Sequence, residues 1–145
     1  MKYEIRHRSH SYVIATVEAD TFKLAIEWAL KRRVNLSEAD LARVDLSDMN
    51  LSKLTLVRAD LSGARLCGTN LYGTNLSRTK LSGADLSGSN LYATDLTGAD
   101  LSNANFSNSD LSGSELAGAN LSGADFTGSN LLGAHFSTAT LSPAA

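Results

Sequence analysis

Leucine or phenylalanine recurs at every fifth position of this chain, from Leu36 to Leu141. The 22 consecutive positions contain no insertion, and phenylalanine occupies only Phe106, Phe126 and Phe136. A helix buries residues spaced by about 3.6 positions, so a spacing of five carries the apolar residues around the helix axis and leaves no single buried face. A long flat strand needs alternation at period two. The spacing therefore argues against both regular elements over most of the chain.

Each repeat of five residues has the same internal plan, which residues 84–88 (Ala-Asp-Leu-Ser-Gly) illustrate. A small residue lies two positions before the central Leu or Phe, Asp or Asn mostly lies one before it, and Ser or Thr followed often by Gly comes after. Residues two apart in an extended segment point to the same side, and Ser-Gly has the chemistry of a turn. Each repeat therefore predicts one wall and one corner of a coil, with the central and small residues inside.

The charges in the outward position before each centre indicate how many walls complete a coil. Stacked coils lie about 4.8 Å apart, where like charges are unfavourable. A coil of three repeats stacks Arg65 on Lys80 and gives six unfavourable contacts against one favourable contact. A coil of four repeats stacks residues 20 apart, places Arg65 between Asp45 and Asp85, and gives four favourable contacts against two. We therefore predict four walls, with one coil completed by every four repeats.

Residues 34–143 resemble the pentapeptide-repeat family, whose repeat is roughly Ala-(Asp/Asn)-Leu-x-x. The resemblance implies an all-β solenoid, a right-handed quadrilateral β-helix, here of 22 repeats in about 5.5 coils, with residues 144–145 as a tail. Departures from the repeat fall in the outward Asp/Asn column and, near the start, in the small inward position. They are Thr55, Arg65, Lys80 and His135 in the first column, and Val34, Val44, Met49 and Leu54 in the second.

Residues 1–33 lack the repeat and predict a small α/β cap. Residues 2–19 alternate well enough for a β-hairpin around the Ser9-His10-Ser11 turn. Asp20 or Thr21 can then cap a helix that extends to about residue 33. A solenoid needs its first coil covered, which favours a cap; an independent binding module is the alternative.

The net charge of −2 hides a strong asymmetry. Residues 1–80 hold all 13 Lys and Arg with 9 acids, whereas residues 81–145 hold 6 acids and no Lys or Arg. The single Cys67 rules out an intrachain disulfide, and no apolar stretch is long enough to span a membrane. We predict a cytoplasmic protein that neither enters a membrane nor binds nucleic acid directly.

The sequence contains no metal, phosphate or nucleophile motif, so we predict no cofactor and no enzymatic activity. His135 lies in the outward column one coil beyond Glu115, which indicates a surface ion pair rather than a ligand or general base. His7 and His10 fall in the predicted hairpin, and Cys67 is interpreted as an incidental surface thiol.

Two groups of residues are candidates for protein contact. Tyr72, Tyr92 and Leu132 share one side at steps of 20, which indicates either a contact strip or ordinary stacking between coils. Few residues follow Leu141 to cover the apolar end of the last coil, to which Phe136 also belongs. An uncovered apolar end commonly meets a partner, so we predict a homodimer stacked through the C-terminal coils.

These features support two hypotheses of function. The first is a non-catalytic scaffold or protein-interaction protein that presents a regular surface to an unknown partner. The second comes from the resemblance, because some quinolone-resistance members are thought to imitate duplex DNA and bind DNA gyrase. The candidate DNA-mimic acids are Asp85, Asp95, Asp100, Asp110, Glu115 and Asp125. Their expected distribution over four walls and the basic N-terminal half count against mimicry.

Overall fold

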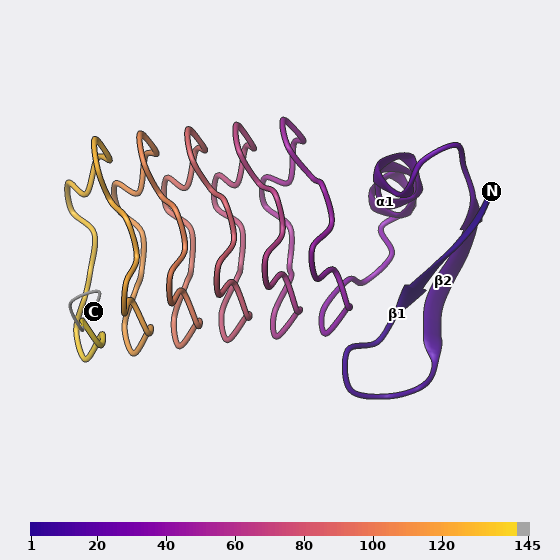
Figure 1. The fold of residues 1–145 in the computed structure, drawn as a ribbon, viewed down its shortest axis with the longest axis horizontal. Coiled ribbons are helices and arrows are strands. Elements are labelled where there is room, and N and C mark those ends of the chain that lie inside the picture. Colours follow the sequence, from indigo (N-terminus) through magenta and orange to yellow (C-terminus); the bar gives the residue numbers. More distant parts are fainter. Residues whose placement is uncertain (142–145) are drawn as a thin grey trace.

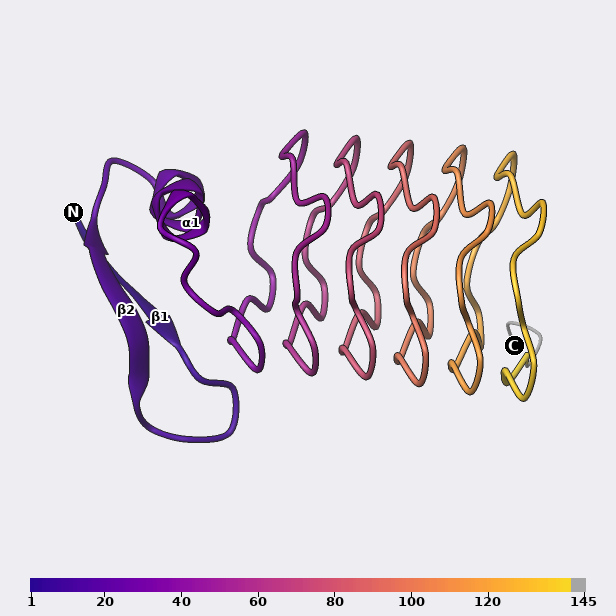
Figure 2. The same cartoon turned by 180° about the vertical axis from the view of Figure 1, so that it is seen from behind.

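The computed structural model describes residues 1–141 and shows a rod of stacked coils closed at one end by an α/β cap. Two strands, β1 (Lys2–Arg6) and β2 (Val13–Glu18), and one helix, α1 (Phe22–Lys31), precede the rod. Figure 1 shows the coils as a column of similar loops, and Figure 2 shows the same column from behind. Residues 142–143 of the expected repeat and the expected tail 144–145 lie outside the described residues. No helix among residues 1–141 is long and apolar enough to cross a membrane.

The period of four repeats is confirmed by the pairing of the coils. Parallel bridges join positions four repeats apart from Asp40–Asp60 to Asn120–Thr140, including both contacts of Arg65, with Asp45 and Asp85. Each wall contributes one such bridge per coil, so the expected quadrilateral β-helix is the observed fold. The walls contain no longer strands, because each short extended piece is followed at once by a corner.

The interior consists of the central Leu and Phe side chains and the small residues beside them. From Leu61 to Leu116 every central residue is essentially inaccessible to solvent. Small polar residues enter this interior, and most of their hydroxyls are hydrogen-bonded: Thr79 Oγ1 donates to the Leu76 carbonyl at 2.6 Å, and Thr94 Oγ1 to the Leu71 carbonyl at 2.8 Å. Ser114 Oγ is buried without a partner. Burial of a hydroxyl is tolerated where such a bond forms.

The corners depend on one backbone conformation. In each corner the residue two after the centre has positive φ. In all of these corners except that of Leu51, the amide of the following residue donates to the central carbonyl, as Ala84 donates to Leu81 at 3.0 Å. Positive φ at only the second of the two corner residues is the mark of a type II turn. All 11 glycines of the chain occupy this position. Other residues hold it too, including Lys53 (φ 59°), Arg78 (φ 56°) and Ala93 (φ 55°).

The cap covers the first coil through apolar packing and backbone hydrogen bonds. Thr21 is the N-cap of α1 and accepts a hydrogen bond from the Leu24 amide, and the helix ends two residues before the expected boundary at 33. Ile26 and Ile5 belong to the same buried cluster as the first centres of the rod. The end of β1 pairs with the first coil, since the Asp40 amide donates to the Arg6 carbonyl at 2.7 Å. These contacts favour the interpretation of residues 1–33 as a cap of the rod over that of an independent binding module.

Candidate protein-contact surface

One corner of the rod carries the predicted aromatic residues, and we call the column Lys53, Tyr72, Tyr92, Ser112 and Leu132 the corner strip. Tyr72, Tyr92, Ser112 and Leu132 occupy the same corner position in successive coils, because the bridges place residues 20 apart on the same wall. Lys53 belongs to the same corner one coil earlier, at the next position of the turn. Asparagine or aspartate side chains fix the backbone at these corners: Asn90 Oδ1 accepts from the Tyr92 amide at 3.0 Å. The sequence thus positions the strip through the same turn chemistry that makes every corner.

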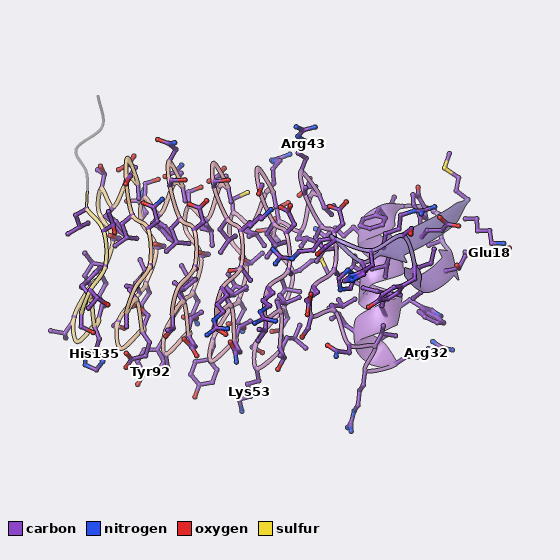
Figure 3. All side chains as sticks on the ribbon, turned by 90° about the horizontal axis from the view of Figure 1, so that it is seen from below. Glu18, Arg32, Arg43, Lys53, Tyr92 and His135 are labelled. Atoms are coloured by element: carbon purple, nitrogen blue, oxygen red, sulfur yellow. The ribbon has the colours of Figure 1, made fainter. Side chains whose placement is uncertain are left out.

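The two tyrosines stack on each other along the rod. Their ring centroids are 5.7 Å apart with an interplanar angle of 4°, and Lys53 Nζ lies 5.7 Å from the Tyr72 centroid. Tyr72 is 38% exposed and Tyr92 is 47% exposed. In Figure 3 Lys53 and Tyr92 project from the same edge of the rod, and Arg43 projects from the opposite edge. Stacking between coils therefore occupies the ring faces that meet, while a large part of both rings stays open to a partner.

The other three candidate contact residues lie in the last described coils and form a second surface. Leu132 belongs to the corner strip and is 79% exposed. Phe136 points into the rod but is only partly buried, and Leu141 is 69% exposed. Phe126 stacks under Phe106 at 5.1 Å, so the apolar column continues to this end. The dimer expected through these coils stays a prediction.

The six candidate DNA-mimic acids lie on all four walls. One wall carries Asp100 next to Lys80, a second carries Asp85 and Asp125, and a third carries Asp110. The fourth, which we call the Asp95 wall, presents Thr55, Asn75, Asp95, Glu115 and His135 in successive coils. The arrangement brings no more than two of the six acids into one column.

Residues of the next corner donate hydrogen bonds to the carboxylates of these aspartates, as Asp110 and Asp125 illustrate. The Ser112 hydroxyl donates to Asp110 Oδ1 at 2.5 Å and the Ser112 amide donates to the same oxygen, and together they lower the pKa of Asp110 below its usual 3.8. Thr127 lowers the pKa of Asp125 in the same way, hydroxyl first and amide second. Hydrogen bonds to an ionised carboxylate favour the charged form.

Replacing Ser112 with alanine is expected to raise the pKa of Asp110 toward 3.8, because the hydroxyl is the largest cause of its lowering. The pKa of Asp125 serves as the control and should not move. Because the folded pKa of Asp110 is depressed, its contribution to stability is present above about pH 4 and is lost as pH falls through the folded pKa. NMR titration of both carboxyl groups measures the change, and an unaltered Asp110 titration would contradict the assignment.

The histidines and the cysteine occupy surface or cap positions. His135 Nδ1 lies 2.5 Å from Glu115 Oε1, as the predicted ion pair requires. His7 is 8% exposed, and its Nε2 lies 3.2 Å from Glu38 at the junction of cap and rod. Cys67 is a half-buried free thiol. Among residues 1–141 no three His, Cys, Asp or Glu side chains are arranged to hold a metal ion.

Sequence reasoning missed the cations at the two corners that bound the Asp95 wall. Lys53, Arg58 and Arg78 all stand two positions after a centre, where glycine is common, and all have positive φ. Arg58 and Arg78 are stacked on the far corner of the Asp95 wall, where they line a shallow hollow with Asp95. The signal in the sequence was a long charged residue at a repeat position that glycine usually occupies. Arg58 and Arg78 are 20 residues apart, so the four-repeat period places them on the same corner.

Comparison with known proteins gives one family and several related structures. The model of the family "Pentapeptide repeats (8 copies)" matches residues 32–68, 69–108 and 104–142. Comparison with curated proteins gave no match. The crystal structure of a pentapeptide repeat protein from the Arabidopsis thaliana thylakoid lumen is similar, with 36% identity, 70% of each chain covered and a TM-score of 0.67.

More distant structures share the repeat. HetL from the cyanobacterium Nostoc, involved in regulation of heterocyst differentiation, is 30% identical, with 71% of this chain and 64% of HetL covered and a TM-score of 0.35. A plasmid-mediated fluoroquinolone resistance protein is 22% identical, with 71% and 60% covered and a TM-score of 0.33. The family model spans most of the chain and four repeats complete each coil, so the chain belongs to the pentapeptide-repeat family.

Proposed function

We propose that the protein is a non-catalytic scaffold that binds a protein partner through the corner strip. The observation that supports this proposal is the exposure of Tyr92 (47%) and Leu132 (79%) on a rod whose other large apolar side chains mostly lie inside. Aromatic residues are enriched in protein interfaces, where they supply contact area at a small cost in conformational entropy. The surrounding coils hold the strip rigid, so binding needs little ordering of the chain.

Affinity capture from the native host tests the scaffold proposal. The wild-type protein is compared with a Tyr92→Ser, Leu132→Ser double variant, which removes the exposed apolar groups but leaves the interior intact. Tyr12→Ser is the matched control, because Tyr12 is an exposed tyrosine (57%) in the cap. We expect the strip variant to lose partners that the wild type and the control retain. Identical sets of captured proteins for all three would reject the strip as the contact surface.

DNA mimicry with DNA gyrase as partner is the second candidate function. Its support is the absence of Lys and Arg from residues 81–145, which carry six acids. It ranks second because those acids are divided among four walls, whereas a protein that imitates duplex DNA needs its charge presented to the side where the partner binds. A gyrase supercoiling assay with the purified protein is decisive: neither inhibition nor protection at micromolar concentration would reject mimicry.

A cytoplasmic location also stays a proposal. It rests on the single Cys67, which fits a reducing compartment. The similar Arabidopsis protein is a thylakoid lumen protein. Fractionation of host cells would locate the protein directly.

A further inference from the structure

The corner strip contains a notch. Tyr72 and Tyr92 fill successive coils with stacked rings, but the next coil carries Ser112 and Gly113 at the same corner. A Cβ at Gly113 would meet Tyr92 Cε2 at 3.6 Å, so the Tyr92 ring lies against this glycine and no side chain continues the stack. Leu132 follows one coil later and is 79% exposed. The strip therefore has two projecting aromatic side chains, a notch at Ser112 where no large side chain projects, and an exposed apolar side chain at Leu132.

We propose that the corner strip binds a second copy of this chain, with the two rods side by side and antiparallel. Tyr72 and Ser112 lie one coil to either side of Tyr92, because each coil has four repeats. A two-fold axis at the level of Tyr92 then brings Tyr72 of each copy opposite the notch at Ser112 of the other. Such an interface is self-complementary, as closed two-fold symmetry requires. The inference rests on the proposed function, since it names the partner of the same strip.

The charges on and around the Asp95 wall favour the antiparallel arrangement. A two-fold axis perpendicular to the rods places the Asp95 wall of one copy beside the Asp95 wall of the other. On this wall the cations Arg58 and Arg78 lie toward the cap, and the acids Asp95 and Glu115 lie toward the other end. When the rods are antiparallel, the height of Arg78 along the rod axis lies between the heights of Asp95 and Glu115 of the second copy. Parallel rods would instead place the arginines beside the wall that carries Asn70 and Asn90. The side-chain amides of that wall are uncharged and form no ion pairs with arginine.

The geometry also sets the strength of this dimer. The strip extends over four coil spacings, or about 19 Å, and is only one corner wide. Such a contact falls below the roughly 800 Å² per partner of a typical stable interface. We therefore expect a weak, reversible dimer whose affinity decreases as salt screens the charges on the Asp95 wall. The cap does not meet the described coils of the second copy, because residues before 43 lie beyond the level of its residue 141.

Thiol cross-linking tests the arrangement. In a Cys67→Ser background, Lys53→Cys and Leu132→Cys are treated with a short bismaleimide, separately and mixed. Antiparallel rods place position 53 beside position 132 of the other copy, whereas two copies of position 53 are about 19 Å apart. We expect cross-linked dimers in the mixture and none in either variant alone. Dimers of Lys53→Cys alone would indicate parallel rods, and no dimers in any sample would indicate no lateral contact; either result overturns the proposal.

Sedimentation equilibrium with a filled notch provides the second readout. Ser112→Tyr should raise the dimer dissociation constant by at least about tenfold, since its ring occupies the place of Tyr72 from the second copy. Ser102→Tyr is the matched control on the opposite corner, because both hydroxyls donate to an aspartate two residues earlier. Equal dimerisation of the two variants would refute the notch. If the wild type stays monomeric while strip-dependent capture of another protein persists, this inference fails and the proposed function stands.

Discussion

Replacing Leu86 with alanine is expected to lower the free energy of unfolding by about 2–5 kcal/mol. Leu86 is fully buried in the column that continues through Leu66 and Phe106. The cavity cannot close, because backbone hydrogen bonds hold the neighbouring coils at a fixed spacing: the Leu86 amide donates to the Asn105 carbonyl at 2.7 Å. A side chain lost from the middle of a solenoid also weakens two coil interfaces at once. Urea denaturation followed by circular dichroism measures the loss.

Ser87→Ala is the control for this substitution. Ser87 is the next residue in the chain and lies at the corner, and its amide, which donates to Asp85 Oδ1 at 3.0 Å, is retained in the variant. We expect a change within about 0.5 kcal/mol, as for most surface substitutions. Similar losses for the two variants would mean that the inside and the outside of the coil had been assigned wrongly.

Replacing Ile26 with aspartate is expected to detach the cap at a cost of about 3–5 kcal/mol, because a carboxyl group would be buried without a partner. Ile26 is 1% exposed and packs in the cluster that joins α1 to the first coil. Detachment would also break the backbone bonds from Arg8 to Glu38 and from Asp40 to Arg6. Hydrogen exchange should therefore accelerate at the Arg8 and Asp40 amides before it changes in the middle of the rod.

Leu24→Asp separates the loss of packing from a general effect on the helix. Leu24 lies in the same helix but is 45% exposed, so its carboxylate would remain solvated. We expect the Arg8 and Asp40 amides to exchange as in the wild type. Full protection of these amides in Ile26→Asp would show that the cap does not depend on this contact.

The rod could be predicted from the sequence because the order of charged residues indicates how many repeats complete one coil. Arg65 between Asp45 and Asp85 distinguished four walls from three, and the bridges confirm that choice. The positive φ of residues such as Lys53 and Ala93 was harder to predict from the sequence, since nothing in those side chains favours positive φ. Each adopts it because the coils before and after fix both ends of the corner, so tertiary context overrides local preference.

The contact surface was only partly predictable. The sequence placed Tyr72 and Tyr92 on one side, but not the parallel stacking of their rings or the notch beyond them, because both depend on side-chain direction at the corner. The junction of cap and rod was also missed in detail. The pairing of the end of β1 with Asp40 joins segments of different sequence pattern, and no periodicity relates them.

The completion of each coil by four repeats has a consequence for changes in the length of the rod. Insertion or deletion of a single repeat preserves every inward position, so the interior stays filled, yet it turns all later residues by a quarter revolution about the rod axis. Between Tyr72 and Tyr92 such a change would send the two rings in different directions. Only the gain or loss of a whole coil keeps each surface residue on its original side of the rod. Selection for the strip would therefore restrict changes in length that the packing of the interior would tolerate.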